Sequence, residues 1–371
     1  MDKQQKPKGK SLLKALLALV LTGALLLGGW FAYLSTLTAD DYIIKGDKKS
    51  VQGEYEAAIL AYSKAIELES NNALAYSNRG FAKSQLGQYT KAIQDYDIAI
   101  ELNPSNPDAD VHYQRALINS NLEQYEAAVR DYDKAIELDA SNAVYYISRG
   151  DAKYQLERYK AAIQDYDKAI KLEAANADIY YKRAKATSNL EQHEAAIQYY
   201  DKAIALDADS ADYYAGRGDA KRYLDQYQAA IEDYGKALEL NPSDANMYHA
   251  RGLTNNNLEQ HETAIQDYDK AIALDANNAT YYASRGDAKY RLDQYQEAIQ
   301  DYDEAIRLNS NAAHTYNSRG SAKSRLGQYA ESIEDYDKAI ELESNNASAY
   351  SNRGFAKSQL GQYAEAIQDY A

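Results

Sequence analysis

The residue types that carry catalytic and metal chemistry are few in this sequence, and a repeat sets their spacing. Among the 371 residues there are five histidines and no cysteine, which excludes thiol catalysis, disulfides and thiolate metal sites. His112, His193 and His261 stand where other copies of the repeat carry tyrosine, and His249 and His314 stand alone. Because a metal site needs converging ligands, we expect neither a metal nor a cofactor.

Motifs for catalysis are also missing. The sequence has no His-Glu-x-x-His, phosphate-binding loop, Gly-x-Ser-x-Gly or strand-linked Gly-x-Gly-x-x-Gly motif. Acidic pairs such as Asp131 with Asp133 recur with the repeat, and Arg-Gly-Asp, which begins at Arg149, Arg217 and Arg285, falls inside an expected helix each time. An active site requires one unique constellation. Since the copies are nearly identical, the sequence predicts a protein that is not an enzyme.

The net charge of −15 is unevenly distributed. Residues 1–14 carry five lysines against one aspartate, a charge of +4, which leaves −19 for the rest of the chain. An acidic body of this kind repels phosphate backbones. We therefore expect no nucleic acid partner, and we expect no small-molecule substrate.

Residues 15–34 form an uncharged run of 20 residues, long enough for a helix of about 30 Å that crosses a bilayer. The basic residues 1–14 precede it and Asp40 and Asp41 follow it, so the positive-inside rule predicts a cytoplasmic N-terminus. The repeats would then lie on the periplasmic or extracellular side. The alternative is a cleaved signal peptide and a secreted protein, but the apolar run exceeds the usual length of roughly 7 to 15 residues.

From residue 39 onward the chain repeats itself. An arginine followed by Gly or Ala recurs every 34 residues, with one step of 36, at Arg79, Arg115, Arg149, Arg183, Arg217, Arg251, Arg285, Arg319 and Arg353. We therefore divide residues 39–371 into ten copies, the last incomplete, that begin at Ala39, Ala73, Ala109, Ala143, Ala177, Ala211, Ala245, Ala279, Ala313 and Ala347.

Each copy is expected to form a helix hairpin. In the second copy, residues 73–106, a first helix runs to about Ser84, Gly87 breaks it, and a second helix covers residues 89–100. Small residues such as Gly80 stand where the two helices must touch, with tyrosines around them. Residues 39–371 are thus predicted to be helical throughout.

This pattern resembles the tetratricopeptide repeat (TPR), which has aromatic residues at positions 4 and 24 and small residues at positions 8, 20 and 27 of each copy. The resemblance covers residues 39–371. It implies an all-α, right-handed α-solenoid of about ten helix-turn-helix repeats, preceded here by one N-terminal transmembrane helix. The sequence departs from the family in its arginine at position 7 and in keeping the proline of position 32 only at Pro104 and Pro242.

The arginine at position 7 has an aspartate at position 23 of the same copy as its expected partner. We predict that Arg79 and Asp95, and their equivalents in other copies, bridge the two helices, because arginine can offer a bidentate fork. The fifth copy breaks the rule, with Arg183 and Tyr199 at these positions. We interpret this pairing as structural.

The resemblance also implies a concave groove lined by the first helices through positions 2, 5, 9, 12 and 13 of each copy. Tyrosine and arginine are favoured interface anchors, so an extended peptide or a helix is expected to lie along this wall. The candidate binding residues are Tyr113, Leu117, Asn121, Asp151, Tyr154, Tyr181, Lys185, Asn189, Asp219, Arg222, Tyr223, His249, Asn256, Asp287, Tyr290 and Arg291.

Together these features predict a membrane-anchored, non-enzymatic scaffold or adaptor that binds partner proteins or peptides in the concave groove. The alternative is a peptide-binding chaperone or an accessory subunit of an envelope complex. The chaperone would bind unfolded chains broadly, whereas the scaffold would select particular partners.

Overall fold

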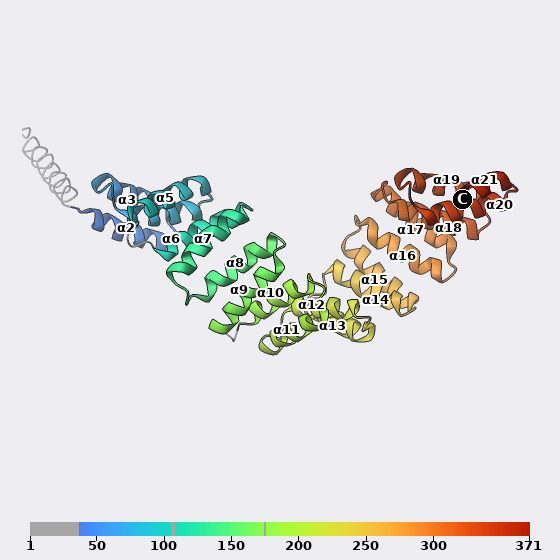
Figure 1. Cartoon of the computed structure of the whole chain (residues 1–371), viewed down its shortest axis with the longest axis horizontal. Coiled ribbons are helices and arrows are strands. Elements are labelled where there is room, and N and C mark those ends of the chain that lie inside the picture. The colour runs from blue at the N-terminus through green and yellow to red at the C-terminus, as the bar shows by residue number, and fades with distance from the viewer. Residues whose placement is uncertain (1–36, 105–107, 174–175) are drawn as a thin grey trace, which may run out of the picture. The chain divides into compact units, whose positions relative to one another are not determined.

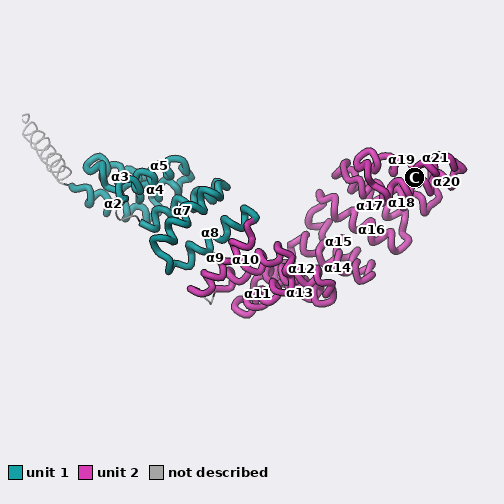
Figure 2. Tube along the Cα trace, viewed as in Figure 1, with its two compact units in different colours: residues 1–157 teal, residues 158–371 magenta. Residues whose placement is uncertain are grey.

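The computed structural model describes residues 37–104, 108–173 and 176–371. Within these ranges it contains twenty α-helices and no strand, so the protein is all-α, as the sequence predicts (Figure 1). Each copy of the repeat contributes a first and a second helix. The helices form two compact units, residues 1–157 and 158–371 (Figure 2), which we call unit 1 and unit 2.

In unit 1, first helices alternate with second helices through the first three copies, and the first helix of the fourth copy ends the unit. The helices are α2 (Ala39–Val51), α3 (Tyr55–Leu68), α4 (Ala73–Gln85), α5 (Tyr89–Leu102), α6 (Ala109–Asn121), α7 (Tyr125–Leu138) and α8 (Ala143–Gln155).

Unit 2 begins with the second helix of the fourth copy and continues to the tenth. Its helices are α9 (Tyr159–Leu172), α10 (Ala177–Ser188), α11 (His193–Leu206), α12 (Ala211–Tyr223), α13 (Tyr227–Leu240), α14 (Ala245–Asn257), α15 (His261–Leu274), α16 (Ala279–Arg291), α17 (Tyr295–Leu308), α18 (Ala313–Arg325), α19 (Tyr329–Leu342), α20 (Ala347–Gln359) and α21 (Tyr363–Tyr370).

Most first helices begin with a side-chain cap. Asn72, for example, accepts a hydrogen bond from the backbone N–H of Ala75 at 3.0 Å, and Asp244 accepts one from Met247 at 3.0 Å. These caps satisfy N–H groups that have no partner inside the helix. The Asn, Asp and Thr residues of these turns therefore help to fix where most first helices begin.

The turn inside each hairpin places one residue in the left-handed region. Glycine holds this place in four turns, with φ between 70° and 78°, and Glu or Asp holds it in six, with φ between 56° and 60°. A left-handed residue ends a helix because it lets the following N–H groups bond back to the last carbonyls. In the second copy the N–H of Gln88 donates to the carbonyl of Lys83 at 3.0 Å.

A buried tyrosine of the second helix holds most hairpins together. Tyr234 is fully buried, and a methyl group added to Gly218 of the facing helix would lie 2.8 Å from its Cε1. Gly286 with Tyr302 repeats this contact, at 2.7 Å. The core is thus a series of small clusters rather than one large centre, as expected for a repeat array.

No helix in the described part of the chain is long and apolar enough to cross a membrane. The predicted transmembrane segment, residues 15–34, lies outside the described residues. The membrane anchor therefore stays a prediction from the sequence.

Candidate binding groove

In most copies the arginine at position 7 joins three helices. In the sixth copy, Nε and Nη2 of Arg217 donate to the carboxylate of Asp233 at 2.9 and 2.6 Å, and Nη1 donates to Asp201 of the preceding copy at 2.6 Å. The predicted pair of Arg79 and Asp95 is also present, at 2.9 and 2.7 Å. The bridge within a copy is therefore confirmed. The second aspartate, at position 25 of the preceding copy, was missed, although its regular recurrence in the sequence could have revealed it.

In the fifth copy, which lacks the aspartate at position 23, the arginine at position 7 has a different partner. Arg183 lies over the ring of Tyr199, 3.5 Å from its centroid, and donates from Nε to Asp167 of the preceding copy. A guanidinium gains electrostatic attraction from the face of an aromatic ring. In this copy a cation–π contact with Tyr199 thus replaces the ion pair, and Arg183 remains packed between the helices.

First helices of consecutive copies also contact each other through aromatic rings. A ring at position 5 of an odd-numbered copy packs on a tyrosine at position 3 of the next copy. The pairs are Tyr113 with Tyr145, Tyr181 with Tyr213, and His249 with Tyr281, with ring centroids 5.0, 5.1 and 5.0 Å apart. The structure thus places three of the predicted binding residues where they also hold neighbouring copies together.

His249 shows the effect of this packing on its chemistry. The imidazole lies between Tyr268 and Tyr281, and its Nε2 lies 3.0 Å from Oγ of Ser284. Burial, reinforced by the positive charge of Arg222, lowers the pKa of His249 to about 4. The ring is therefore neutral at pH 7 and serves as a packing residue.

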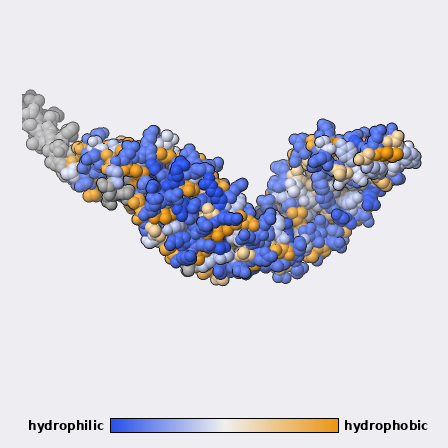
Figure 3. Space-filling view, in the orientation of Figure 1, coloured by the Kyte–Doolittle hydropathy of each residue, from blue (hydrophilic) through white to orange (hydrophobic). Residues whose placement is uncertain are grey.

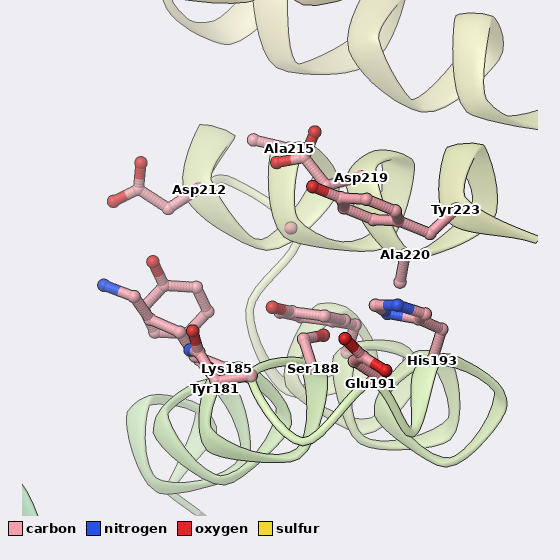
Figure 4. A pocket seen from close by; sticks show the side chains of 13 residues that line it. Tyr181, Lys185, Ser188, Glu191, His193, Asp212, Ala215, Asp219, Ala220 and Tyr223 are labelled. Atoms are coloured by element: carbon pink, nitrogen blue, oxygen red, sulfur yellow. Dashed lines mark hydrogen bonds between the residues drawn. The ribbon is translucent and has the colours of Figure 1, made fainter. Parts of the chain in front are cut away.

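A hollow of about 750 Å³ lies between the first helices α10 and α12 (Figure 4). We call it the aromatic hollow. In Figure 4, Asp212, Asp219 and Tyr223 reach from α12 on one side, and Tyr181 and Lys185 from α10 on the other. The complete lining is Tyr181, Lys185, Ser188, Asn189, Glu191, His193, Tyr200, Asp212, Ala215, Gly216, Asp219, Ala220 and Tyr223.

Five of these residues were predicted from the sequence: Tyr181, Lys185, Asn189, Asp219 and Tyr223. The structure adds Glu191 of the hairpin turn, His193 at the start of α11 and Tyr200 from the middle of α11, which lie outside the first helices and so outside the positions considered in the sequence analysis. It also adds five residues of the first helices that the analysis did not choose, although Asp212 stands at position 2: Ser188, Asp212, Ala215, Gly216 and Ala220. The ring of His193 stacks on Tyr223 with centroids 4.7 Å apart.

Tyr200 lines the hollow because of two small residues. Where most copies have glycine at position 8, the fifth has Ala184, which is buried. Tyr200 lies instead against Gly216 of the next copy, where an added methyl group would stand 2.5 Å from its Cε1. The corresponding position carries serine in the fourth and eighth copies, at Ser148 and Ser284. Gly216 therefore makes the room that Tyr200 occupies.

The aromatic hollow is acidic on balance. Its lining has three carboxylates, Glu191, Asp212 and Asp219, against the ammonium group of Lys185. The hydroxyl of Tyr234 donates to Asp219 at 2.8 Å, which keeps that carboxylate in place.

A second hollow of opposite character lies farther along unit 2. Two cavities of about 420 and 400 Å³ share Tyr290, Ser321 and Arg325, and we call them together the arginine hollow. Residues of the first helices α14, α16, α18 and α20 form most of it, and α17 and α19 contribute tyrosines. The lining is Asn256, Asp287, Tyr290, Arg291, Tyr302, His314, Ser318, Ser321, Ser324, Arg325, Tyr329, Tyr336, Asn352 and Phe355. Four predicted residues lie here: Asn256, Asp287, Tyr290 and Arg291.

The remaining predicted residues have other surroundings. In unit 1, Leu117 packs against the cluster around Tyr132, Asn121 is exposed, and Asp151 and Tyr154 are half-buried. In unit 2, Arg222 donates from Nε to the hydroxyl of Tyr234 at 3.3 Å and lies 4.6 Å from the ring centroid of Tyr223. Arg222 therefore helps to hold the ring of Tyr223 in place.

The surface seen in Figure 3 is mainly hydrophilic, with apolar residues in scattered patches, one of them at the C-terminal end over α20 and α21. Phe355, Tyr363 and Ile367 are exposed there. Among the described residues, no group of three or more His, Asp or Glu side chains is placed to hold a metal ion.

Comparison with protein families gives repeated matches along the chain. The family described as "TPR repeat" matches residues 46–87, 150–190, 218–259, 256–293, 286–327 and 325–361. A second family, described as tetratricopeptide repeat, matches residues 73–106 and 109–142. A third family with the same description matches residues 177–210. No curated protein sequence matches the chain.

Solved structures show the same fold. The C-terminal part of a TPR repeat-containing protein from Cytophaga hutchinsonii is 18% identical, with a TM-score of 0.57 over 65% of this chain and 98% of that one. A tetratricopeptide repeat protein from Parabacteroides merdae is 17% identical, with a TM-score of 0.53 over 67% and 98%. YrrB, described as a TPR protein with an unusual peptide-binding site, is 23% identical, with a TM-score of 0.45 over 50% and 95%.

Proposed function

The chain belongs to the tetratricopeptide repeat family, and from this premise we propose that it is a non-enzymatic scaffold that holds an extended segment of a partner protein along the first helices of unit 2. The aromatic hollow carries this proposal. It combines a volume of about 750 Å³ with aromatic rings and charged groups on both walls. Binding sites of this kind join an apolar surface to a few polar groups that fix orientation.

Tyr223 is the side chain best placed to anchor a partner. It is 62% exposed, yet the ring is held by stacking on His193 and by the guanidinium of Arg222. A preorganised aromatic side chain contributes to binding without a large loss of conformational entropy. We expect partner contacts to centre on this ring.

We further propose that residues 15–34 anchor the scaffold in a membrane, with the repeats on the non-cytoplasmic side. The uncharged run and the lysines before it support this placement. Protease treatment of intact and opened cells tests the orientation, because only translocated repeats are cleaved in intact cells with a permeable outer envelope. The mass of the mature chain tests the alternative of a cleaved signal peptide.

Cross-linking in cells followed by purification from detergent-solubilised membranes tests the scaffold function. Affinity for the captured partner is then measured with the purified wild-type chain and with Tyr223→Ala. We expect the substitution to weaken binding by about tenfold or more, as at an interface hot spot. Tyr363→Ala is the matched control, because Tyr363 is similarly exposed, at 67%, and lies on α21.

Equal affinities of the wild-type chain and Tyr223→Ala would show that the partner does not use the aromatic hollow. Comparable affinity for many unfolded proteins would instead favour the second candidate function, a peptide-binding chaperone. The exposed aromatic and apolar side chains of the groove give that reading its support.

A further inference from the structure

Two arginines of the arginine hollow lack the partners that other arginines of unit 2 have. At position 7, Arg285 and Arg319 each form ion pairs with two aspartates. No ion pair joins Arg291 or Arg325 to a carboxylate within the residues that the structure describes. On a chain whose residues beyond 14 carry a net charge of −19, two such cations in the lining of one hollow are unexpected.

Arg325 is held by neutral groups. Its Nε donates to the hydroxyl of Tyr290 at 3.3 Å. Asp293 acts on Arg325 only at longer range, and the hydroxyl of Tyr295 already donates to that carboxylate, at 2.5 Å. The remaining N–H groups of Arg325 are therefore available to an incoming acceptor.

The surroundings of the two arginines are rich in hydrogen-bond donors. The hydroxyl of Ser318 and the amide group of Asn256 line the same hollow. Ser321 and the amide of Asn352 line it too, but they already donate within the chain, to Asn317 and to Ser321. Asp287 is the carboxylate of the lining, and it is already engaged. Its Oδ1 accepts the Tyr302 hydroxyl at 2.8 Å, and its Oδ2 faces Nε2 of His314 at 3.6 Å.

We propose that the arginine hollow binds an acidic side chain, Asp or Glu, of the partner segment held by unit 2. This inference rests on the proposed function, and it names the chemistry of the partner. A carboxylate would meet the guanidinium groups of Arg291 and Arg325 together with serine and asparagine donors. Hydrogen bonds between charged groups are shorter and stronger than neutral ones.

The negative charge of the rest of the chain also favours binding of an acidic side chain at the arginine hollow over binding elsewhere on the surface. An acidic partner is repelled by most of the surface and attracted at this hollow, so electrostatics favours one register of the segment. The aromatic hollow, with three carboxylates against one lysine, would reject the same side chain. A segment with its acidic residue at the arginine hollow is thereby fixed in direction.

The repeat itself supplies the matched variants. Position 13, which carries Arg291 and Arg325, is glutamine at Gln85, Gln155 and Gln359 in other copies. Replacement of both arginines by glutamine therefore removes the charge and keeps a residue that this helix position accepts. Arg307→Gln in α17 is the control for loss of positive charge, because Arg307 is exposed and pairs only locally, with Glu304.

The experiment selects peptides from a random display library on the immobilised full chain. We expect Asp or Glu to be enriched at one peptide position with the wild-type chain and with Arg307→Gln, and not with Arg291→Gln/Arg325→Gln. For one selected peptide, the double variant should weaken binding by about tenfold or more, and so should Glu→Gln in the peptide. Combined, the two changes should cost little more than either alone. Circular dichroism verifies that the variants remain helical.

Three outcomes would overturn the inference. In the first, the selected peptides show no enrichment of Asp or Glu and yet bind the Tyr223→Ala variant more weakly than the wild-type chain. This result would overturn the inference about the arginine hollow and leave the proposed function standing. Preference for phosphoserine over Glu at the enriched position would reassign the hollow to phosphate. Failure to select any peptide would remove both this inference and the proposed function.

Discussion

Gly235 faces Nη1 of Arg251, at the place where the neighbouring copies put an aspartate. An ideal Cβ added to Gly235 would lie 4.0 Å from Nη1, with no other atom nearer. Arg217 and Arg285 meet Asp201 and Asp269 there, each at 2.6 Å. The chain thus omits one ion pair between the sixth and seventh copies.

Gly235→Asp should therefore stabilise the protein. The carboxylate restores the missing contact with Arg251. Loss of glycine from the interior of α13 removes only part of its helix cost of about 0.5–1 kcal/mol relative to alanine, because aspartate is itself a weak helix former. Together we expect a gain of about 1 kcal/mol in the free energy of unfolding, measured by urea denaturation. Gly235→Asn isolates the helix contribution, because asparagine has nearly the helix propensity of aspartate and carries no charge. An aspartate variant no more stable than the asparagine variant would mean that the added ion pair contributes nothing.

Arg217→Leu should destabilise unit 2, although leucine is usual at this position in the family. Asp233 is buried, and after the substitution only Lys221, at 2.8 Å, would balance its charge. Breaking a buried ion pair costs about 3–5 kcal/mol, and because Lys221 remains we expect about 2–3 kcal/mol. Asp201→Asn, at the exposed end of the same arginine, should cost less than about 1 kcal/mol. A higher melting temperature for Arg217→Leu would contradict the bridge.

Glu259→Gly should raise stability modestly. Glu259 has φ of 58°, whereas glycine fills the corresponding turn position at Gly327 with φ of 76°. A left-handed conformation costs a residue with Cβ roughly 1–2 kcal/mol, partly offset by the greater freedom of glycine in the unfolded chain. We expect a gain of about 0.5 kcal/mol from thermal or urea unfolding. The reverse change, Gly327→Glu, should lower stability, and the same sign for both substitutions would contradict this account.

His249→Tyr should reduce the loss of stability in mild acid. The pKa of His249 is lowered to about 4 in the folded chain, from an ordinary value near 6.5. Between these values the unfolded chain binds the proton and the folded chain does not, so stability falls as pH drops from about 6.5 toward 4. At pH 5 we expect this residue to account for about 1–2 kcal/mol. Tyrosine is the residue at the same position in Tyr113 and Tyr181.

The measurement compares unfolding free energies of the wild-type chain and His249→Tyr at pH 7 and pH 5. Carboxylates that titrate in the same range contribute equally to both proteins, so the difference between the two isolates the histidine. An unchanged difference between pH 7 and pH 5 would show that His249 does not keep a lowered pKa.

The sequence by itself determined the helices and the bridge inside most copies. A 34-residue period, asparagine caps and a turn residue after each first helix are local signals, and local signals fix where helices begin and end. Arg79 and Asp95 are separated by 16 residues in one hairpin, so their contact follows from the hairpin alone. The family resemblance rested on the same positions.

Only the tertiary structure decided which side chains the groove presents. Tyr181 packs on the next copy as well as lining the aromatic hollow, and His249 packs on the next copy without lining a hollow, because neighbouring first helices lie close enough for their rings to meet. At position 8, where most copies have glycine, the methyl group of Ala184 occupies the space next to the tyrosine of the second helix. Tyr200 therefore lies against Gly216 of the next copy, which has no side chain, and lines the aromatic hollow. Such outcomes depend on the volumes of residues in different copies. A repeat pattern, which describes one copy at a time, cannot contain them.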